Sequence, residues 1–259
     1  MRPAQGFGGS FGIRWDLRLW STRLAIVTFV LSVLLMGAHH LPESVGIGII
    51  KGFTFAPAEV RHGLVWQLAT YAFAEVNPLN LLFTVYALLV FGAGVEERVG
   101  SNAFFGWFFG LALAGSLVAV GLSFIWGAVA DSRYLGASVV ALGLLVVWVA
   151  LNRGATINFF MVLPMKAEWL LYLTLGMMVL SAWSARSPAE YVPHFAAFFG
   201  AELATRTGFE LSPRRLYLRW RAHRIEQELR KRSSKFKVIT GGDEPDDDKD
   251  TPGSGGFLN

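Results

Sequence analysis

Six apolar runs constrain the fold of this 259-residue chain more than any other feature. A helix needs about 20 mostly apolar residues to cross a bilayer. The runs cover residues 23–41, 78–95, 102–126, 134–151, 166–184 and 191–206. One short apolar run is often a buried helix of a soluble protein. Six in succession instead predict an all-α, polytopic bundle of six transmembrane helices.

Charge is distributed unevenly along the chain. The chain has 23 Lys and Arg residues and 19 Asp and Glu residues. Half of all these charged residues lie after residue 205. The preceding part is only roughly one-tenth charged, whereas an average soluble domain is about one-quarter charged. So few charges cannot cover a water-facing surface, which excludes an ordinary soluble enzyme, a disordered protein and a nucleic-acid-binding domain. The absence of Cys excludes a disulfide scaffold, Cys-ligated metal sites and thiol catalysis.

The positions of Lys and Arg predict the orientation. If the N-terminus is inside, the inner segments before the tail carry seven of these residues and the outer segments carry four. Excess positive charge marks the cytoplasmic side of a membrane protein. Both termini are therefore expected in the cytoplasm, which agrees with an even number of spans.

The chain divides into three parts. We expect a cytoplasmic N-terminal segment at 1–22, a membrane domain at 23–206 and a cytoplasmic polar tail at 207–259. Within the membrane domain, residues 42–77 are apolar but interrupted by Pro and Gly, and they contain Trp and Tyr. Because Trp and Tyr favour the membrane–water interface, this segment is expected to be a structured loop at the outer surface rather than a plain connection.

The tail has two compositions. Ser212-Pro213 is a typical helix start, so a basic helix is expected at about 213–232. Its basic face favours an anchor at the anionic inner leaflet, and nucleic-acid binding is the less favoured interpretation. Beyond Thr240 the chain is acidic and rich in Gly and Pro, and it is expected to be disordered.

Two polar groups within the predicted spans suggest chemistry. Ser138 follows Gly136 and Ala137 at the start of the fourth run, and His194 lies near the start of the sixth. Small residues also serve helix packing, and a lone His in a bundle is often only a hydrogen-bonding group. Polar groups inside a membrane bundle nevertheless mark function more often than elsewhere. Taken alone, each residue leaves both interpretations open.

The predicted topology places these two side chains at a similar depth. With both termini inside, the fourth and sixth spans run in the same direction, and Ser138 and His194 each lie about one turn from the outer end. Ala197 and Ala201 follow His194 at helical spacing and offer a face for close packing. Topology thus permits a contact in which His194 acts as general base for Ser138, as acyl transfer requires.

Hydrogen-bond donors occur at the same expected depth in the second run. Asn80 and Thr84 are four residues apart, so they share one helix face. They are candidate oxyanion donors or else ordinary interhelical hydrogen-bonding groups. After this run, Gly100 is expected to close the helix and Ser101 to cap the next one.

Several motifs, in this order, resemble the rhomboid family of intramembrane serine proteases over about 23–206. They are Trp66-Gln67-Leu68-Ala69-Thr70-Tyr71 for the family's Trp-Arg-x-x-Thr, Asn80-Leu81-Leu82-Phe83-Thr84 for His-x-x-Phe-Asn, the turn Gly94–Ser101 for the Glu-containing Gly-Ser turn, Gly136-Ala137-Ser138 for Gly-x-Ser, Pro164–Trp169 for the entry to the fifth span, and His194 with its small residues. The resemblance assigns structural roles to Trp66, Glu96, Gly100 and Gly136.

The resemblance implies proteolysis of transmembrane protein substrates near the outer surface, without cofactor or metal. Ser138 would be the nucleophile and His194 the base, with Asn80 and Thr84 at the family's oxyanion positions. The bilayer is the implied environment, in the plasma (inner) membrane of a bacterium, and no nucleic-acid partner is expected. The sequence does not indicate the oligomeric state.

The chain also departs from the family's pattern. Gln67 replaces an Arg, Asn80 a His, Thr84 an Asn, and Val139 the Gly that usually follows the nucleophile. These replacements support a second hypothesis, in which the chain is a catalytically inactive rhomboid-like protein that binds transmembrane clients as an adaptor or chaperone. The retained Ser–His pair favours the enzyme.

Overall fold

The computed structural model describes residues 16–40, 42–159, 163–185 and 187–207, together with 221, 224 and 225. The chain forms two units, Met1–Leu216 and Tyr217–Asn259. In the second unit the three described residues are helical. The rest of the expected basic helix and the expected acidic end lie outside the described residues, as do the first 15 residues.

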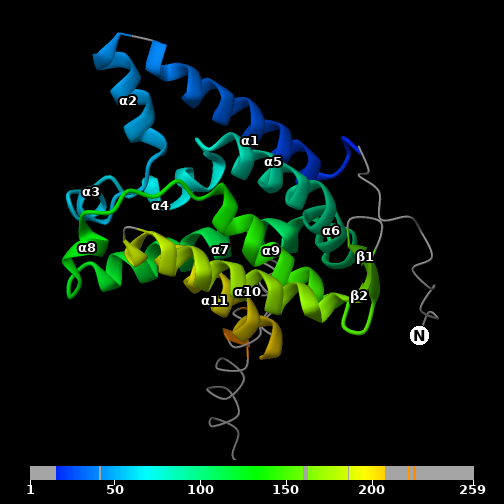
Figure 1. The fold of residues 1–259 in the computed structure, drawn as a ribbon. Coiled ribbons are helices and arrows are strands. Elements are labelled where there is room, and N and C mark those ends of the chain that lie inside the picture. The colour runs from blue at the N-terminus through cyan, green and yellow to red at the C-terminus, as the bar shows by residue number, and fades with distance from the viewer. Residues whose placement is uncertain are drawn as a thin grey trace, which may run out of the picture. The chain divides into compact units, whose positions relative to one another are not determined.

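The fold is mostly helical, and a helix stands at each of the six apolar runs (Figure 1). These helices are α1 (Trp20–Gly37), the continuous helix of α5 (Pro78–Ala87), η3 (Leu88–Gly92) and α6 (Ala93–Val99), α7 (Ser101–Leu122), α9 (Ala137–Leu151), α10 (Ala167–Ser184) and α11 (Val192–Arg206). Within the described part of the chain, three are long and apolar enough to cross a membrane: Trp20–Gly37, Pro78–Val99 and Ser101–Leu122. The apolar helix α9 is shorter, so the six-span arrangement stays a prediction.

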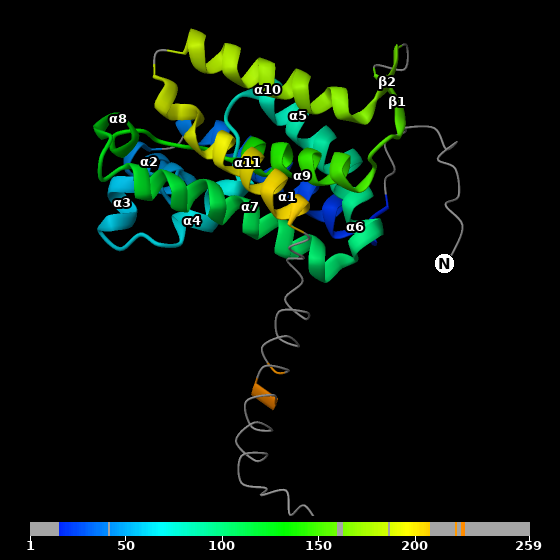
Figure 2. The same cartoon turned by 90° about the horizontal axis from the view of Figure 1, so that it is seen from below.

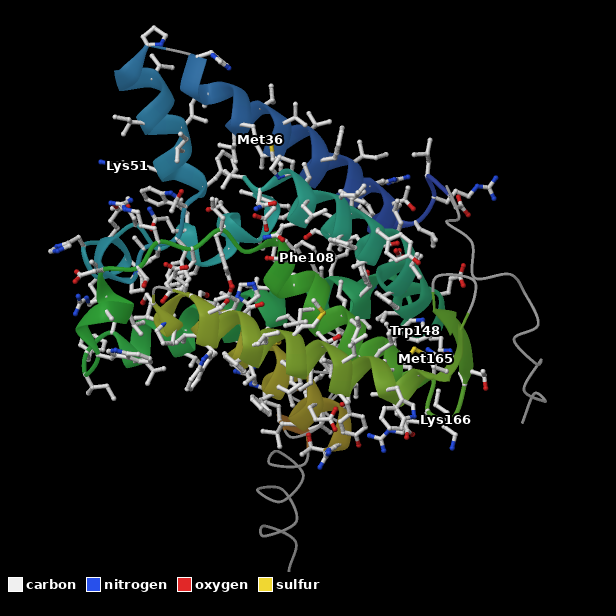
Figure 3. The ribbon with its side chains drawn as sticks, viewed as in Figure 1. Met36, Lys51, Phe108, Trp148, Met165 and Lys166 are labelled. Carbon is white, nitrogen blue, oxygen red and sulfur yellow. The ribbon has the colours of Figure 1, made fainter. Side chains whose placement is uncertain are left out.

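Helix α9 occupies the centre of the first unit. It packs against α5, α7, α10 and α11 (Figures 1 and 2). Its sequence is apolar on every face, and such a helix must be buried on all sides. Trp148 lies in its C-terminal half (Figure 3). The ring of Trp148 packs against that of Phe91, with 5.3 Å between the ring centroids. In the first turn of α9, which contains Ser138, the neighbouring side chains of Ala137, Val139 and Val140 are buried in the bundle.

The segment between the first two apolar runs is folded. It contains η1 (Ala38–His40), α2 (Glu43–Phe53), α3 (Pro57–Arg61), α4 (Gln67–Thr70) and η2 (Tyr71–Phe73). Phe55 and Tyr71 are fully buried. Phe55 also forms an isolated antiparallel bridge with Tyr134, with N–O distances of 2.9 and 2.8 Å. These bonds tie the segment to the residues that lead into α9.

The remaining connections are short. Helix α8 (Gly127–Ala130) follows α7, and η4 (Pro188–Tyr191) precedes α11. The antiparallel hairpin of β1 (Thr156–Phe159) and β2 (Leu163–Lys166) joins α9 to α10, with Thr156 opposite Lys166. The hairpin lies at the far end of α9 from Ser138 and does not enter the candidate site (Figure 2).

A buried carboxylate joins the start of α1 to the end of α6. Glu96 is 3% exposed. It accepts hydrogen bonds from the backbone N–H groups of Trp20 (3.0 Å) and Ser21 (2.8 Å) and from the Ser101 hydroxyl (2.8 Å). Gly100 links α6 to α7 with a φ of 83°. Ser101 was expected to cap α7, but Gly100 holds that position, because the hydroxyl of Ser101 is taken by the buried carboxylate.

This carboxylate is expected to contribute strongly to stability. Replacing Glu96 with Ala removes the acceptor for three donors, two of them N–H groups of a helix start. We expect the free energy of unfolding to fall by about 3 kcal/mol. Thermal unfolding in detergent measures the change. The exposed Glu168 is the matched control, because Glu168→Ala should cost less than about 1 kcal/mol; equal effects for both variants would contradict this role.

Candidate active site

Ser138 and His194 lie in the first turns of two neighbouring helices. Ser138 is the second residue of α9 and His194 the third of α11. The Ser138 Oγ lies 3.2 Å from the His194 Nε2, which is within reach of proton transfer. Ala197 and Ala201 are fully buried on α11. Small side chains let helices approach closely, and α11 packs against both α9 and α7, which brings the two polar groups together.

The imidazole of His194 has an apolar setting. Its ring lies 5.7 Å from the ring of Tyr191. The Nδ1 atom is buried and makes no hydrogen bond of acceptable geometry within the described part of the chain. No described carboxylate therefore orients this ring through Nδ1. For Nε2 to accept the Ser138 proton, the neutral ring must carry its hydrogen on Nδ1.

The turn before Ser138 is shaped by Tyr71. Its hydroxyl donates to the Ala112 carbonyl oxygen of α7 at 2.7 Å, and burial raises the pKa of this phenol. The ring of Tyr71 packs directly on Gly136, so that a Cβ there would overlap the ring. The Gly136 N–H donates to the Tyr71 carbonyl oxygen at 3.0 Å. Gly136 thus allows the outer segment to pack against the start of α9.

Glu75 also lies at this place, and the sequence interpretation missed it. The Ala137 N–H donates to the Ala74 carbonyl oxygen at 3.3 Å, which brings Glu75 beside Ser138. The Glu75 side chain is 5% exposed, and the Ser138 side chain lies near enough to its carboxyl group to lower the pKa of that group. Burial raises the pKa of Glu75 above its usual value. The available signal was a single charged residue between Arg61 and Glu96, in an otherwise uncharged stretch.

The structure does not join Asn80 and Thr84 to the Ser–His pair. Both belong to α5, yet Asn80 is exposed and Thr84 is 2% exposed. Within the described residues, neither side chain has a recorded hydrogen bond to Ser138 or His194. Asn77 caps this helix, since its Oδ1 accepts from the N–H groups of Leu79 (3.0 Å) and Asn80 (3.2 Å).

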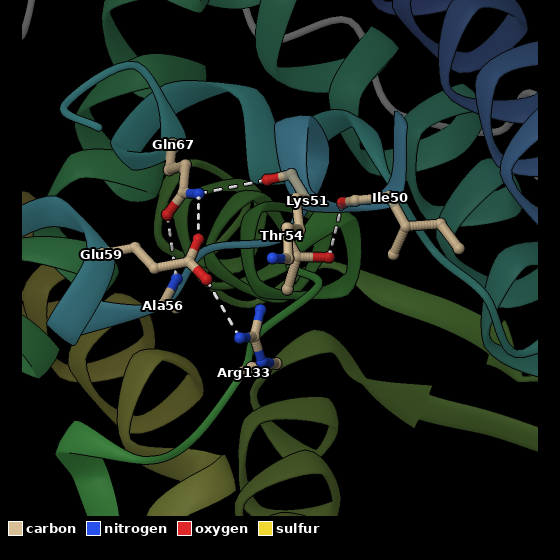
Figure 4. A network of polar contacts seen from close by, with 7 residues as sticks. All are labelled: Ile50, Lys51, Thr54, Ala56, Glu59, Gln67 and Arg133. Carbon is tan, nitrogen blue, oxygen red and sulfur yellow. Dashed lines mark hydrogen bonds and ion pairs between the residues drawn. The ribbon is translucent and has the colours of Figure 1, made fainter. Parts of the chain in front are cut away.

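Gln67 organises the outer segment instead of entering the site (Figure 4). Its amide Nε2 donates to the Lys51 carbonyl oxygen (3.1 Å) and to the Glu59 Oε2 (2.8 Å), and its Oε1 accepts from the Ala56 N–H (3.2 Å). Glu59 also pairs with Arg133 at 3.0 Å. The hydrogen bond from Gln67, and then the charge of Arg133, hold the pKa of Glu59 below its usual value. This network fixes α3 and α4 relative to the approach to α9.

Two further motif residues have structural surroundings. The Trp66 side chain is 54% exposed, and its carbonyl oxygen accepts from the Thr70 N–H (3.0 Å) and hydroxyl (3.1 Å). Val139 is buried and faces Gly115 of α7, where a Cβ would lie 3.2 Å from its Cγ1. Val139 therefore packs towards α7.

Comparison with known proteins identifies the class. Residues 62–213 match the Rhomboid domain. This match covers more than half of the chain, so the chain belongs to the rhomboid family. Over 110 residues it is also 27% identical to Rhomboid-like protease 3 of Toxoplasma gondii, which covers 42% of this chain and 41% of that protein. Together with the apolar helices, the family identifies an integral membrane protein related to proteases.

Proposed function

We propose that this protein is an intramembrane serine endopeptidase that cleaves transmembrane protein substrates with a Ser138–His194 dyad. The observation that carries the proposal is the 3.2 Å separation of the Ser138 Oγ and the His194 Nε2 at the starts of two packed helices. A Ser hydroxyl is a weak nucleophile until a neighbouring base removes its proton. We propose His194 as that base.

The proposed reaction has two halves. The Ser138 Oγ bonds to the scissile carbonyl carbon while His194 Nε2 takes the hydroxyl proton, and the carbonyl oxygen becomes an oxyanion. When the C–N bond breaks, His194 returns that proton to the leaving amine. Water then attacks the acyl-enzyme, again giving its proton to His194, and the Ser138 oxygen recovers a proton as the acid product leaves.

The backbone of Ser138 supplies one proposed oxyanion donor. In the first turn of α9, the N–H of Ala137 is bonded to Ala74, and those of Val139 and Val140 to Gly136. The Ser138 N–H has no recorded acceptor within the described part of the chain. An unpaired N–H at a helix start favours negative charge. This group therefore supports stabilisation of the oxyanion on Ser138.

Asn80 is the proposed second donor, because it occupies a family donor position and its exposed amide is free to turn towards substrate. Asn80→Ala should lower turnover by about 10²–10³, with little change in stability. Asn80→His, which restores the family residue, should retain or raise turnover. Cleavage of a single-span substrate at equal expression measures both variants. Unchanged turnover in Asn80→Ala would remove Asn80 from the site.

We propose six spans with both termini in the cytoplasm, in the plasma membrane of a bacterium. The excess of Lys and Arg in the segments expected inside supports this orientation. A reporter fused after residue 209 should be cytoplasmic. An external reporter would contradict the topology, and it would leave the Ser138–His194 geometry untouched.

A second candidate is a catalytically inactive protein that binds transmembrane clients. It is favoured by the exposed position of Asn80 and because, within the described part of the chain, no carboxylate is hydrogen-bonded to the His194 Nδ1. This alternative predicts that wild type and Ser138→Ala bind a transmembrane helix equally and cleave nothing. Cleavage and co-purification of the same single-span substrate, measured side by side, separate the two functions.

A further inference from the structure

Glu75 is a buried ionisable group next to the nucleophile that the proposed reaction leaves unused. It lies between η2 and α5, immediately before the second apolar run. One oxygen, Oε1, accepts from the N–H groups of Val76 (3.2 Å) and Asn77 (3.4 Å). The bond from the Ala137 N–H to the Ala74 carbonyl oxygen (3.3 Å) sets Glu75 next to Ser138, and the Ser138 side chain acts on the same carboxyl group. The carboxyl group is therefore a neighbour of the atom that would attack substrate.

The surroundings of Glu75 come from three helices. From α1, the Ser32 hydroxyl accepts from the Glu75 N–H at 3.0 Å. From α9, Ser138 faces the carboxyl group, and from α11, His194 approaches through Ser138. Among the described residues, no charged side chain shifts the pKa of this carboxyl group. The titratable group that contacts Ser138 from α11 is His194.

The two protonation states of Glu75 have opposite effects on this site. As a carboxylate, it accepts the Ser138 hydroxyl and draws its proton away from His194 Nε2. Its negative charge also lies where a second negative charge must form, and like charges in a buried site repel strongly. As a neutral acid, it can donate to the Ser138 oxygen instead, which leaves the Ser138 proton for His194.

We propose that Glu75 works as a neutral carboxylic acid that positions the Ser138 hydroxyl, and that its ionisation switches the nucleophile off. This inference rests on the proposed protease function. Glu75 keeps its proton throughout, so the transfers between Ser138, His194 and substrate are unchanged. Its burial fits this role, because burial raises the pKa of Glu75 and so favours the neutral form.

The test is a pH profile of cleavage for the full chain in proteoliposomes. Glu75→Gln stays uncharged at every pH and retains a donor. The wild-type rate should fall as the pH rises through the pKa of Glu75, whereas the rate of Glu75→Gln should not fall there. The ratio of the Glu75→Gln rate to the wild-type rate should rise by about tenfold for each pH unit above the pKa of Glu75. The control Glu168→Gln, at an exposed carboxylate of α10, should show a constant ratio.

Two further measurements separate this inference from the proposed function. The rate at which a fluorophosphonate labels Ser138 reports the nucleophile without any substrate, and it should show the same pH dependence. The pH dependence of the unfolding midpoint reports whether Glu75 is protonated in the folded protein. Because the folded pKa is raised, wild type should lose stability as the pH rises above the usual Glu range, and Glu75→Gln should lose less.

The outcomes are distinct. Parallel pH profiles for wild type and Glu75→Gln, with Ser138→Ala inactive, would overturn the switch and leave the protease standing. Labelling of Ser138 with the expected pH dependence but no cleavage would support the switch and contradict proteolysis of that substrate. Neither labelling nor cleavage at any pH would overturn both proposals. If Glu75→Gln fails to fold, Glu75→Asp replaces it. Because Asp still ionises, the cleavage rate of Glu75→Asp should still fall as the pH rises.

Discussion

Ser138→Ala is expected to lower cleavage by at least about 10³, and His194→Ala by a similar factor, because each change removes one half of a single proton-transfer unit. The double variant should be no slower than either single variant, since a nucleophile without its base and a base without its nucleophile are equally ineffective. Initial rates on one single-span substrate at matched enzyme amounts measure all three. Multiplying effects in the double variant would show that the two residues act independently.

Gly136→Ala is expected to have the largest effect on the architecture of the site. A Cβ at this position would overlap the ring of Tyr71, and both residues are fixed by the bond from the Gly136 N–H to the Tyr71 carbonyl oxygen. Overpacking of this kind costs about 1–3 kcal/mol. Cleavage should also fall, because Ser138 lies two residues further along the same turn.

The matched control for this variant is Gly176→Ala in α10. A Cβ on Gly176 would meet no other atom within 4 Å, and Ala is the better helix former by about 1 kcal/mol. Gly176→Ala should therefore be neutral or stabilising. Equal unfolding midpoints for Gly136→Ala and Gly176→Ala in detergent would show that the contact with Tyr71 does not restrict this position.

Much of the helical framework could be predicted from the sequence, because each apolar run covers most of the helix that it forms. The runs 78–95 and 134–151 correspond to helices that begin at Pro78 and Ala137. Chain direction and depth permitted a contact between Ser138 and His194, and the family resemblance led us to expect it. These features depend on periodicity and length, which are properties of local sequence.

The rest of the site depends on a segment without periodicity. Glu75 and Tyr71 reach the start of α9 only because residues 42–77 fold back through the bridge of Phe55 with Tyr134. Helical spacing gave Asn80 and Thr84 a common face, but it does not show which neighbours cover that face of α5. In the structure Asn80 is exposed and Thr84 is buried. The Ser101 hydroxyl was likewise assigned by local rules, whereas a carboxylate five residues earlier accepts it.

The measurement that tests the central claim most directly is cleavage by the purified full chain in proteoliposomes. A single-span substrate is reconstituted with wild type or with Ser138→Ala in equal amounts, and the products are identified by mass spectrometry. The account predicts a cut near the outer end of the substrate helix with wild type and none with Ser138→Ala. Equal cleavage by both proteins, or an intact substrate with wild type across the pH range and a panel of such substrates, would contradict it.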